Sequence, residues 1–186
     1  MKRLFDFSVA LLSLLILLPL IVIISLAIKL TSPGPILYWS DRVGRNNVLF
    51  KMPKFRTMRI DTPALPTHLL TNPEAYLTPI GPFLRRTSLD EIPQLFSILK
   101  GDMSFVGPRP ALFNQDDLVV LRTESGIHLL TPGLTGWAQI NGRDSLPIPD
   151  KVLLDKEYLE RQSFLFDMYI FARTCKKILF EKDVSH

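Results

Sequence analysis

Cysteine and histidine are scarce in this sequence. Its 186 residues include one cysteine, Cys175, and three histidines. A single thiol excludes an intrachain disulfide and a multi-cysteine zinc site, and it suits a reducing compartment. The histidines show no metal-ligand spacing, so we assign them no role. Because free cysteine usually behaves as a small buried hydrophobe, and Cys175 falls within an apolar stripe, we expect it in the core.

The sequence also lacks the signatures of several common classes. It has no P-loop, no G-x-G-x-x-G fingerprint, no internal repeat and no heptad run. The length permits one ordinary domain with an appendage. The net charge of +4 favours an anionic partner, namely a phosphorylated substrate, a membrane surface or nucleic acid. We expect no nucleic-acid partner, because the basic excess outside residues 41–60 is small and no DNA or RNA motif appears.

Charge is absent from residues 10–28, which read ALLSLLILLPLIVIISLAI. As a helix this run would be about 28 Å long, close to the thickness of the bilayer hydrocarbon. A cleaved signal peptide fits poorly, because the run is long and no A-x-A-like site follows Lys29. We therefore expect residues 1–30 to form a membrane anchor and residues 31–186 to form a small domain outside the bilayer.

Pro19 lies in the middle of the apolar run, where it cannot donate a hydrogen bond to the preceding turn, so we expect a kink or break there. Both flanks are basic, with Lys2 and Arg3 before the run and Lys29 after it. The positive-inside tendency then places both ends in the cytoplasm. A re-entrant helix that bends at Pro19 and returns to the same leaflet satisfies both observations. A single-pass anchor with a kink is the alternative.

The remaining chain mixes strand and helix patterns, which predicts a mostly helical α/β fold. Residues 36–40 (ILYWS) and 48–52 (VLFKM) read as short strands. Residues 164–180 read as an amphipathic helix that packs on the core or lies in the membrane interface. Its predicted apolar side consists of Phe164, Leu165, Met168, Phe171, Cys175, Ile178 and Leu179.

The adjacent acids Asp90 and Glu91 stand where another helix is expected to begin. Apolar residues between positions 89 and 99 follow a helical rhythm, and a glycine at 101 should end it. Ser88 and Glu91 match a capping box, whereas Pro93 favours a start near position 92. In either case the acid pair lies at a helix N-terminus, where the positive end of the dipole favours carboxylates or phosphates.

Four loop-like clusters combine glycine or proline with charged residues. They are KFRTM at 54–58, RRTSLDE at 85–91, KGDMSFVGPRP at 100–110 and TPGLTGWAQINGRDS at 131–145. Loops of this kind often hold sites on a rigid scaffold. The plainer interpretation is ordinary turns, caps and surface charge.

A diphosphate substrate would explain why these clusters combine arginines with carboxylates. Arg85 and Arg109 can grip phosphate oxygens in a bidentate manner. One or two carboxylates, together with substrate oxygens, can hold Mg²⁺. A carboxylate can also attack phosphorus and form an acyl-phosphate. Asp90 and Glu91 are the candidates for both tasks.

The order of these elements is more specific than any one of them. A basic N-terminus, an apolar run interrupted by proline, KFRTM, SLDEIPQLFSILKGDMSFVGPRP and PGLTGWAQINGR follow one another here. This combination resembles the bacterial sugar transferase family, the monotopic phosphoglycosyl transferases that begin lipid-linked glycan assembly. The resemblance covers nearly the whole chain. The chain resembles the minimal catalytic unit of that family.

The resemblance implies a membrane-bound enzyme. It would transfer sugar-1-phosphate from a UDP-sugar to polyprenyl phosphate, release UMP and use Mg²⁺. The implied location is the cytoplasmic face of the bacterial inner membrane, with a re-entrant anchor and amphipathic interfacial helices. A polyprenyl phosphate cannot leave the bilayer whereas a nucleotide sugar is soluble, so their reaction belongs at the interface. A membrane-tethered Mg²⁺-dependent hydrolase of nucleotide sugars and a non-catalytic scaffold are the rivals.

The resemblance also assigns roles to residues. Asp90 would be the nucleophile that carries a covalent phosphosugar, and Glu91 would join Asp90 at the metal. The expected substrate-binding residues are Lys54, Arg56, Arg85, Arg109 and Arg143. Two positions depart from the family pattern: Leu18 precedes Pro19 where relatives have serine, and Thr131 stands where many relatives have a basic residue.

Overall fold

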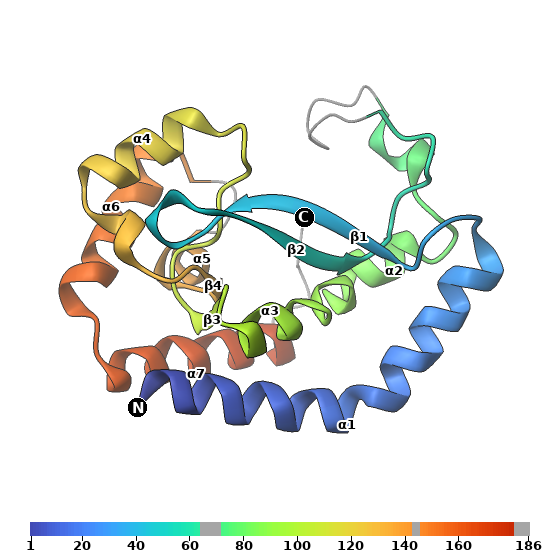
Figure 1. Cartoon of the computed structure of the whole chain (residues 1–186), viewed down its shortest axis with the longest axis horizontal. Helices are drawn as coiled ribbons and strands as arrows, with labels where there is room; N and C mark the ends of the chain where they lie inside the picture. Colours follow the sequence, from blue (N-terminus) through green and yellow to red (C-terminus); the bar gives the residue numbers. More distant parts are fainter. Residues whose placement is uncertain (64–71, 143–145, 181–186) are drawn as a thin grey trace.

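The computed structural model describes residues 1–63, 72–142 and 146–180, with side chains as far as residue 177. Figure 1 shows a long N-terminal helix beneath a small domain of short helices and strands, so the predicted mostly helical α/β fold is confirmed. The helices are α1 (Lys2–Thr31), α2 (Gly81–Arg86), α3 (Gln94–Lys100), α4 (Asp116–Glu124), α5 (Trp137–Asn141), α6 (Ile148–Arg161) and α7 (Phe164–Phe180). The strands are β1 (Leu37–Val43), β2 (Leu49–Phe55), β3 (Ser104–Val106) and β4 (Gly133–Thr135).

The strands form two separate pairs. β1 and β2 make an antiparallel hairpin in which Leu37 pairs with Phe55 and Val43 pairs with Leu49. Both were expected, although each is longer than the sequence pattern suggested. β3 and β4 make a short parallel pair that joins the segment before Arg109 to the PGLTG segment. β2, β3 and β4 thereby contain parts of three of the four charged clusters.

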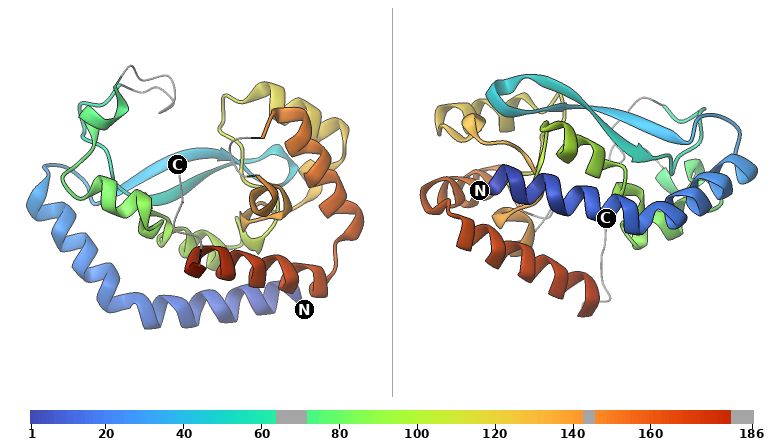
Figure 2. Two further views of the ribbon diagram at one scale, coloured as in Figure 1. Left: turned by 180° about the vertical axis from the view of Figure 1, so that it is seen from behind. Right: turned by 60° about the horizontal axis from the view of Figure 1, so that its bottom comes forward.

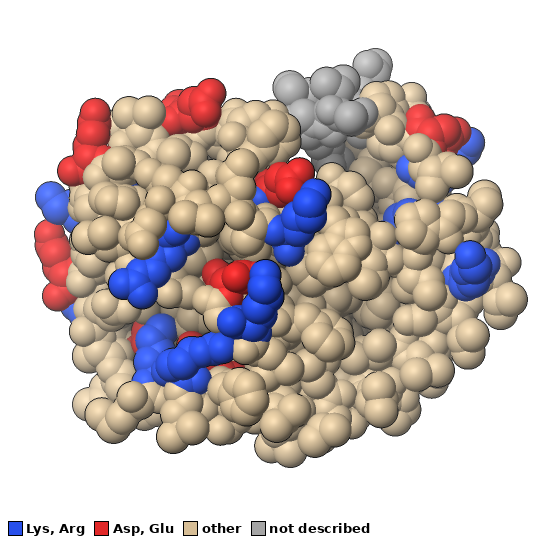
Figure 3. Space-filling model, in the orientation of Figure 1, with Lys and Arg blue, Asp and Glu red and all other residues tan. Residues whose placement is uncertain are grey.

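α1 is one continuous helix with Pro19 inside it. Figure 1 shows the helix bent midway along its length, so the expected distortion is a bend and not a break. By length and composition α1 is able to cross a membrane, and little of its most apolar stretch is buried. Its outward side is strongly apolar, with exposed Leu4, Phe7, Leu11, Leu12, Leu15, Ile16, Leu18, Val22, Ile23 and Leu26. Figure 3 shows this lower edge of the molecule almost bare of charged side chains.

Both halves of α1 also pack against the domain. Ala10 and Leu14 belong to the main core, which centres on residues of α3, β3, α6 and α7. Ile24 and Ile28 form a second buried cluster with Phe55 of β2 and Leu84 of α2, and Ile28 is fully buried. The helix therefore lies along the domain, as the two views of Figure 2 show, and does not project away from it.

The charged residues of the first two turns of α1 are bonded to the domain. Lys2 Nζ lies 2.5 Å from Asp167 Oδ2 of α7. Arg3 donates to the carbonyls of Ile98 and Leu99 at the end of α3. Asp6 is buried because its Oδ1 accepts a 3.1 Å hydrogen bond from the Phe105 amide of β3.

α7 has the predicted bounds and packs on the core, but the predicted buried side is only partly right, because Phe171 packs against the core while other members of that side are exposed. The residues buried against the domain are Phe166, Asp167 and Ile170, whereas Leu165 is 81% exposed. The ring of Phe166 packs against Tyr158 and Trp137, and this contact fixes the orientation of the helix. Cys175 is exposed and does not belong to the core, which corrects the expectation drawn from residue type.

Candidate active site

The acid pair lies in a tight turn just before α3. Asp90 and Glu91 belong to a short 3₁₀ turn, Leu89–Glu91, and α3 begins three residues later at Gln94. Ser88 precedes them in the left-handed conformation, with φ of 55°, which reverses the chain after α2. α3 ends as expected at Gly101, whose φ of 100° suits glycine.

The predicted capping box does not form within the described residues. The Ser88 side chain makes no capping hydrogen bond, and the Glu91 amide instead donates to the Ser88 carbonyl at 3.1 Å. The reason is that the Glu91 carboxylate points to Lys54 of β2, whose Nζ donates to Oε1 at 2.6 Å. A salt bridge across the domain has replaced a local cap.

Lys54 and Arg109 converge on the acid pair. Lys54 Nζ also lies 3.9 Å from Asp90 Oδ2, and Arg109 Nη2 lies 3.6 Å from the same Glu91 Oε1 that Lys54 binds. β2 supplies the lysine and the loop after β3 supplies the arginine. Residues far apart in the sequence thus place two cations beside two carboxylates, which offsets the repulsion of adjacent acids.

Burial governs the titration of Asp90. Asp90 is mostly buried, and desolvation raises its pKa above the ordinary value. Glu91 raises it further, whereas the nearby charges of Lys54 and Arg85 oppose the shift. Arg85 donates from Nε to Thr57 Oγ1 at 3.0 Å, and burial lowers its pKa while Asp90 raises it. Asp90 is therefore a partly desolvated carboxylate held among cations, as a nucleophile requires.

The backbone that carries Arg109 accepts hydrogen bonds from two cationic side chains, each of which is held in an ion pair. We define residues 106–110 as the Arg109 loop. Its first carbonyl, that of Val106, accepts from Lys2 Nζ at 2.9 Å, and Lys2 pairs with the buried Asp167. The Arg109 carbonyl accepts from Arg122 Nη1 at 2.8 Å.

Arg122 is itself held by a buried acid. Its Nη2 lies 2.6 Å from Oδ2 of Asp155 on α6, a residue only 1% exposed. The middle of the loop approaches β4 so closely that a Cβ on Gly107 would lie 2.4 Å from the Thr131 carbonyl. The loop therefore presents the Arg109 guanidinium from a fixed backbone.

Sequence reasoning missed these supporting residues. Lys2 was interpreted only as a topology signal, and Arg122, Asp155 and Asp167 were given no role. A usable signal was present, because Asp155 and Asp167 lie among apolar neighbours in helices, and a buried carboxylate requires a partner. The partners could not be named, since they come from distant parts of the chain.

Of the other predicted substrate-binding residues, Arg56 makes its contacts away from this cluster. Arg56 is buried at the start of the domain, where Nε donates to the Pro35 carbonyl at 2.6 Å and Nη2 to the Ser32 carbonyl at 3.0 Å. These contacts tie the linker after α1 to the end of β2, so they give Arg56 a structural position and do not support the expected phosphate contact. Arg143 lies outside the described residues.

A cavity of about 290 Å³ adjoins the acid pair. Its walls come from α1, α3, α5 and α7 and from the loop residues beside the acids. The lining residues are Ser13, Leu17, Ser88, Glu91, Ile92, Leu95, Phe105, Arg109, Leu134, Thr135, Gln139, Ile140, Phe171, Thr174, Cys175 and Lys177. Half of these side chains and most of the lining surface are apolar, so the charged site lies at the edge of a largely apolar cavity.

Asp90 and Glu91 are the two carboxylates of this site that could coordinate Mg²⁺. The described residues contain no group of three or more His, Cys, Asp or Glu side chains able to hold a metal by themselves. Mg²⁺ commonly uses one or two carboxylates and completes its shell with water and phosphate oxygens. The Asp90–Glu91 pair fits an ion that binds together with a diphosphate, and it does not fit an all-protein cage.

Comparison with known proteins identifies the family of this chain. A model of the family described as bacterial sugar transferase matches residues 1–181. The chain belongs to this family. It is 38% identical to the "Uncharacterized sugar transferase EpsL" of Bacillus subtilis, with all of this chain and 90% of that protein covered.

Longer relatives carry functional names. The chain is 40% identical to the "Undecaprenyl-phosphate glucose phosphotransferase" of Komagataeibacter xylinus over 98% of its own length and 36% of that protein. It is 39% identical to the "UDP-glucose:undecaprenyl-phosphate glucose-1-phosphate transferase" of Escherichia coli K12 over 95% of its own length and 40% of that protein. This sugar transferase chain therefore spans about two fifths of the length of these two relatives.

Proposed function

We propose that this protein transfers sugar-1-phosphate from a UDP-sugar to polyprenyl phosphate and releases UMP. The observation that carries the proposal is the buried Asp90 carboxylate, with Lys54 Nζ 3.9 Å away and the charge of Arg85 near it, at the edge of an apolar cavity walled by α1. The names of the relatives support both the donor and the acceptor class.

The proposed reaction has two displacements at one phosphorus atom. First, an Asp90 carboxylate oxygen attacks the β-phosphorus of the UDP-sugar, the bond to the bridging oxygen breaks, and UMP leaves with that oxygen. An oxygen of polyprenyl phosphate then attacks the same phosphorus, and the bond to Asp90 breaks. The products are polyprenyl diphosphate sugar and the regenerated carboxylate, and no water enters either step.

The neighbouring side chains have separate roles in this proposal. Lys54 opposes the rise in the pKa of Asp90 and so helps to keep the nucleophile ionised. Arg109, from the clamped loop, would bind phosphate oxygens. Asp90 and Glu91 would hold Mg²⁺, which supplies charge neutralisation to the diphosphate when bound. Glu91 is already held by Lys54 and Arg109, so its carboxylate is oriented toward the site.

A re-entrant anchor is supported by the contacts at the two ends of α1. Lys2 is paired with Asp167 near one end, and Ile28 is buried with Leu84 near the other. A transmembrane helix of this length would separate its ends by about 40 Å, on opposite sides of the bilayer. One small domain binds both ends here, so we propose that both face the same side, which the basic flanks identify as the cytoplasmic face of the bacterial inner membrane.

The function is tested with a panel of UDP-sugars, with and without polyprenyl phosphate. We expect one donor, among UDP-glucose, UDP-galactose and UDP-N-acetylglucosamine first, to give UMP and a lipid-linked sugar phosphate in catalytic amounts only when the lipid is present. UMP formation at an equal rate without lipid would favour the hydrolase alternative. No turnover of any donor by protein that binds membranes would favour the scaffold.

A further inference from the structure

Resting on the proposed function, we infer that the cavity between α1, α3, α5 and α7 binds the isoprene units of polyprenyl phosphate nearest its phosphate. The acceptor would enter between α1 and α7 and reach the acid pair from the membrane side. The nucleotide sugar would reach the acids from elsewhere, so the two substrates would not share this chamber.

The surface of the cavity is mostly apolar, with Glu91 and Arg109 at the end beside the acid pair and Lys177 in the part formed by α7. Glu91 and Arg109 lie in its lining beside the site of phosphoryl transfer, and Leu17, Ile92 and Phe171 represent the remaining apolar surface. A prenyl chain attached to a phosphate has the same division, with an anion at one end and branched hydrocarbon beyond it. An arginine at the charged end can receive the phosphate while the apolar wall receives the chain.

The position of the cavity relative to the membrane favours the lipid. One wall is the inner side of α1, through Ser13 and Leu17, and the outer side of the same helix carries the exposed apolar residues proposed to lie in the bilayer. The opposite wall is α7. A hydrocarbon chain in this chamber would therefore lie at the depth of the lipid tails without crossing the domain.

α1 and α7 are in contact near their N-termini and separate toward their C-termini. Near their N-termini the Phe5 ring contacts the rings of Phe164 and Phe171, with centroids 5.7 and 6.3 Å apart. Figure 2 shows the two helices diverging from this point. The cavity residues Thr174 and Cys175 lie farther along α7, on the open side of the aromatic contact.

The competing occupant is the sugar of the donor. A sugar needs several hydrogen-bonding partners. The Thr135 and Thr174 hydroxyls in the wall already bond to each other at 2.7 Å. Gln139 donates from Nε2 to the Leu134 carbonyl, and its buried Oε1 has no partner among the described residues. The largely apolar surface of the cavity suits a prenyl chain better than a sugar, and the experiment below separates the two occupants.

Cys175 provides a native probe of this cavity. It is the single cysteine of the sequence, it is exposed, and it lies in the cavity wall. The full-length protein in detergent micelles is treated with a small maleimide, and the labelling rate is followed by intact mass. Undecaprenyl phosphate, phosphatidylglycerol and the UDP-sugar are added in separate arms. The matched control carries Leu165→Cys with Cys175→Ser, which places the thiol on the exposed side of the same helix.

We expect undecaprenyl phosphate at four times its Kd to slow labelling of Cys175 about fivefold, because only unoccupied protein reacts. Phosphatidylglycerol and the UDP-sugar should leave that rate unchanged, and undecaprenyl phosphate should not slow the Leu165→Cys control. An unchanged Cys175 rate, equal slowing at both positions or with both lipids, or protection by the UDP-sugar alone would each overturn the inference. Labelling requires no turnover, so loss of the proposed activity appears separately, in the UMP assay.

Discussion

Lys2 Nζ lies 2.5 Å from Asp167 Oδ2, which joins the first turn of α1 to the buried side of α7. The same lysine donates to the Val106 carbonyl, and Tyr158 donates to Asp167 Oδ1 at 2.6 Å. Burial, together with this hydrogen bond to Asp167, raises the pKa of Tyr158 far above its ordinary range, so the tyrosine remains a donor. α1 is therefore part of the support for the Arg109 loop.

Replacement of Lys2 tests this connection. Lys2→Ala leaves the buried Asp167 without its cation, and we expect a loss of about 3 kcal/mol in the free energy of unfolding, the lower end for a broken buried pair. The measurement is denaturant or thermal unfolding in a fixed detergent. Lys29→Ala is the control, because Lys29 at the other end of α1 makes only a long, exposed hydrogen bond to the Gly34 carbonyl. Equal losses in both variants would contradict the assigned role.

The Arg122–Asp155 pair makes a second, independent prediction. Asp155→Asn removes the buried partner of the arginine that holds the Arg109 carbonyl, and we expect a loss of about 3–5 kcal/mol in unfolding free energy. At a temperature where the variant remains folded, the KM for the UDP-sugar should rise more than kcat falls. Asp41→Asn is the control, since the exposed Asp41–Lys51 pair should contribute less than about 1 kcal/mol. A stable Asp155→Asn enzyme with unaltered KM would remove the positioning role.

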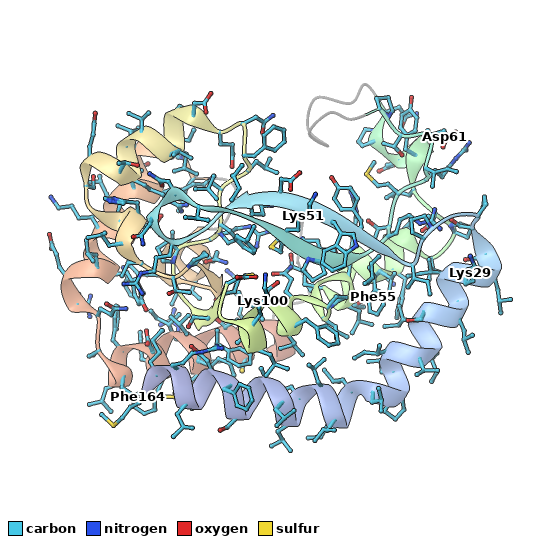
Figure 4. All side chains as sticks on the ribbon, viewed as in Figure 1. Lys29, Lys51, Phe55, Asp61, Lys100 and Phe164 are labelled. Carbon is cyan, nitrogen blue, oxygen red and sulfur yellow. The ribbon has the colours of Figure 1, made fainter. Side chains whose placement is uncertain are left out.

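Lys54 should set the acid limb of the pH–rate profile. Its charge opposes the rise in the pKa of Asp90, so Lys54→Met should raise that pKa further and move the acid limb to higher pH. We also expect single-turnover UMP release to fall by about 10²-fold, because a cation is lost beside the reacting phosphate. Lys51→Met is the matched control on the same strand, where the side chain is exposed (Figure 4). An unmoved acid limb in Lys54→Met would contradict the assignment.

Asp90 should reduce stability at neutral pH. A carboxyl whose pKa is raised by folding binds protons more tightly in the folded state, so its favourable contribution is present below its unfolded pKa and is lost as pH rises through its folded pKa. We therefore expect Asp90→Asn to raise Tm at pH 7 to 8 and to lose this advantage in acid. Melting curves of both proteins from acid pH to pH 8 check the sign of the difference in Tm. A lower Tm for Asp90→Asn at neutral pH would show that Lys54 and Arg85 outweigh desolvation.

The topology of α1 is checked with two probes in proteoliposomes. One fluorophore is attached to the amine of Met1, which is almost fully exposed, and the other to Val48→Cys in a Cys175→Ser background, at the tip of the β1–β2 hairpin. A membrane-impermeant quencher should reach both probes from the same side. Quenching of the two probes from opposite sides would establish a true span.

Local patterns in the sequence identified the elements and most of the central cluster. The hairpin strands, the end of α3 at Gly101 and the bounds of α7 follow from periodicity and from glycine chemistry. Lys54, Asp90, Glu91 and Arg109 were singled out in separate clusters, and the fold brings them together. Such residues could be found because each lies in a segment rich in turn-forming and charged residues.

What remained hidden depends on contacts between distant residues. The phosphate contact of Arg56 stays a prediction: the carbonyls of Ser32 and Pro35 accept from Nη2 and Nε, and the buried Nη1 has no partner among the described residues. The capping box failed because Lys54, from another strand, competes for Glu91. The buried side of α7 differs because Asp167 faces inward to meet Lys2. No local periodicity encodes partners that lie 21 to 165 residues away.

The central claim is that Asp90 carries the sugar phosphate between donor and acceptor. The most direct measurement is intact mass followed by peptide mapping of protein incubated with the active UDP-sugar without lipid. The account predicts a sugar-phosphate adduct on the peptide that contains Asp90, its discharge when polyprenyl phosphate is added, and no adduct on Asp90→Asn. Lipid-dependent turnover by Asp90→Asn, or an adduct on another residue, would contradict it.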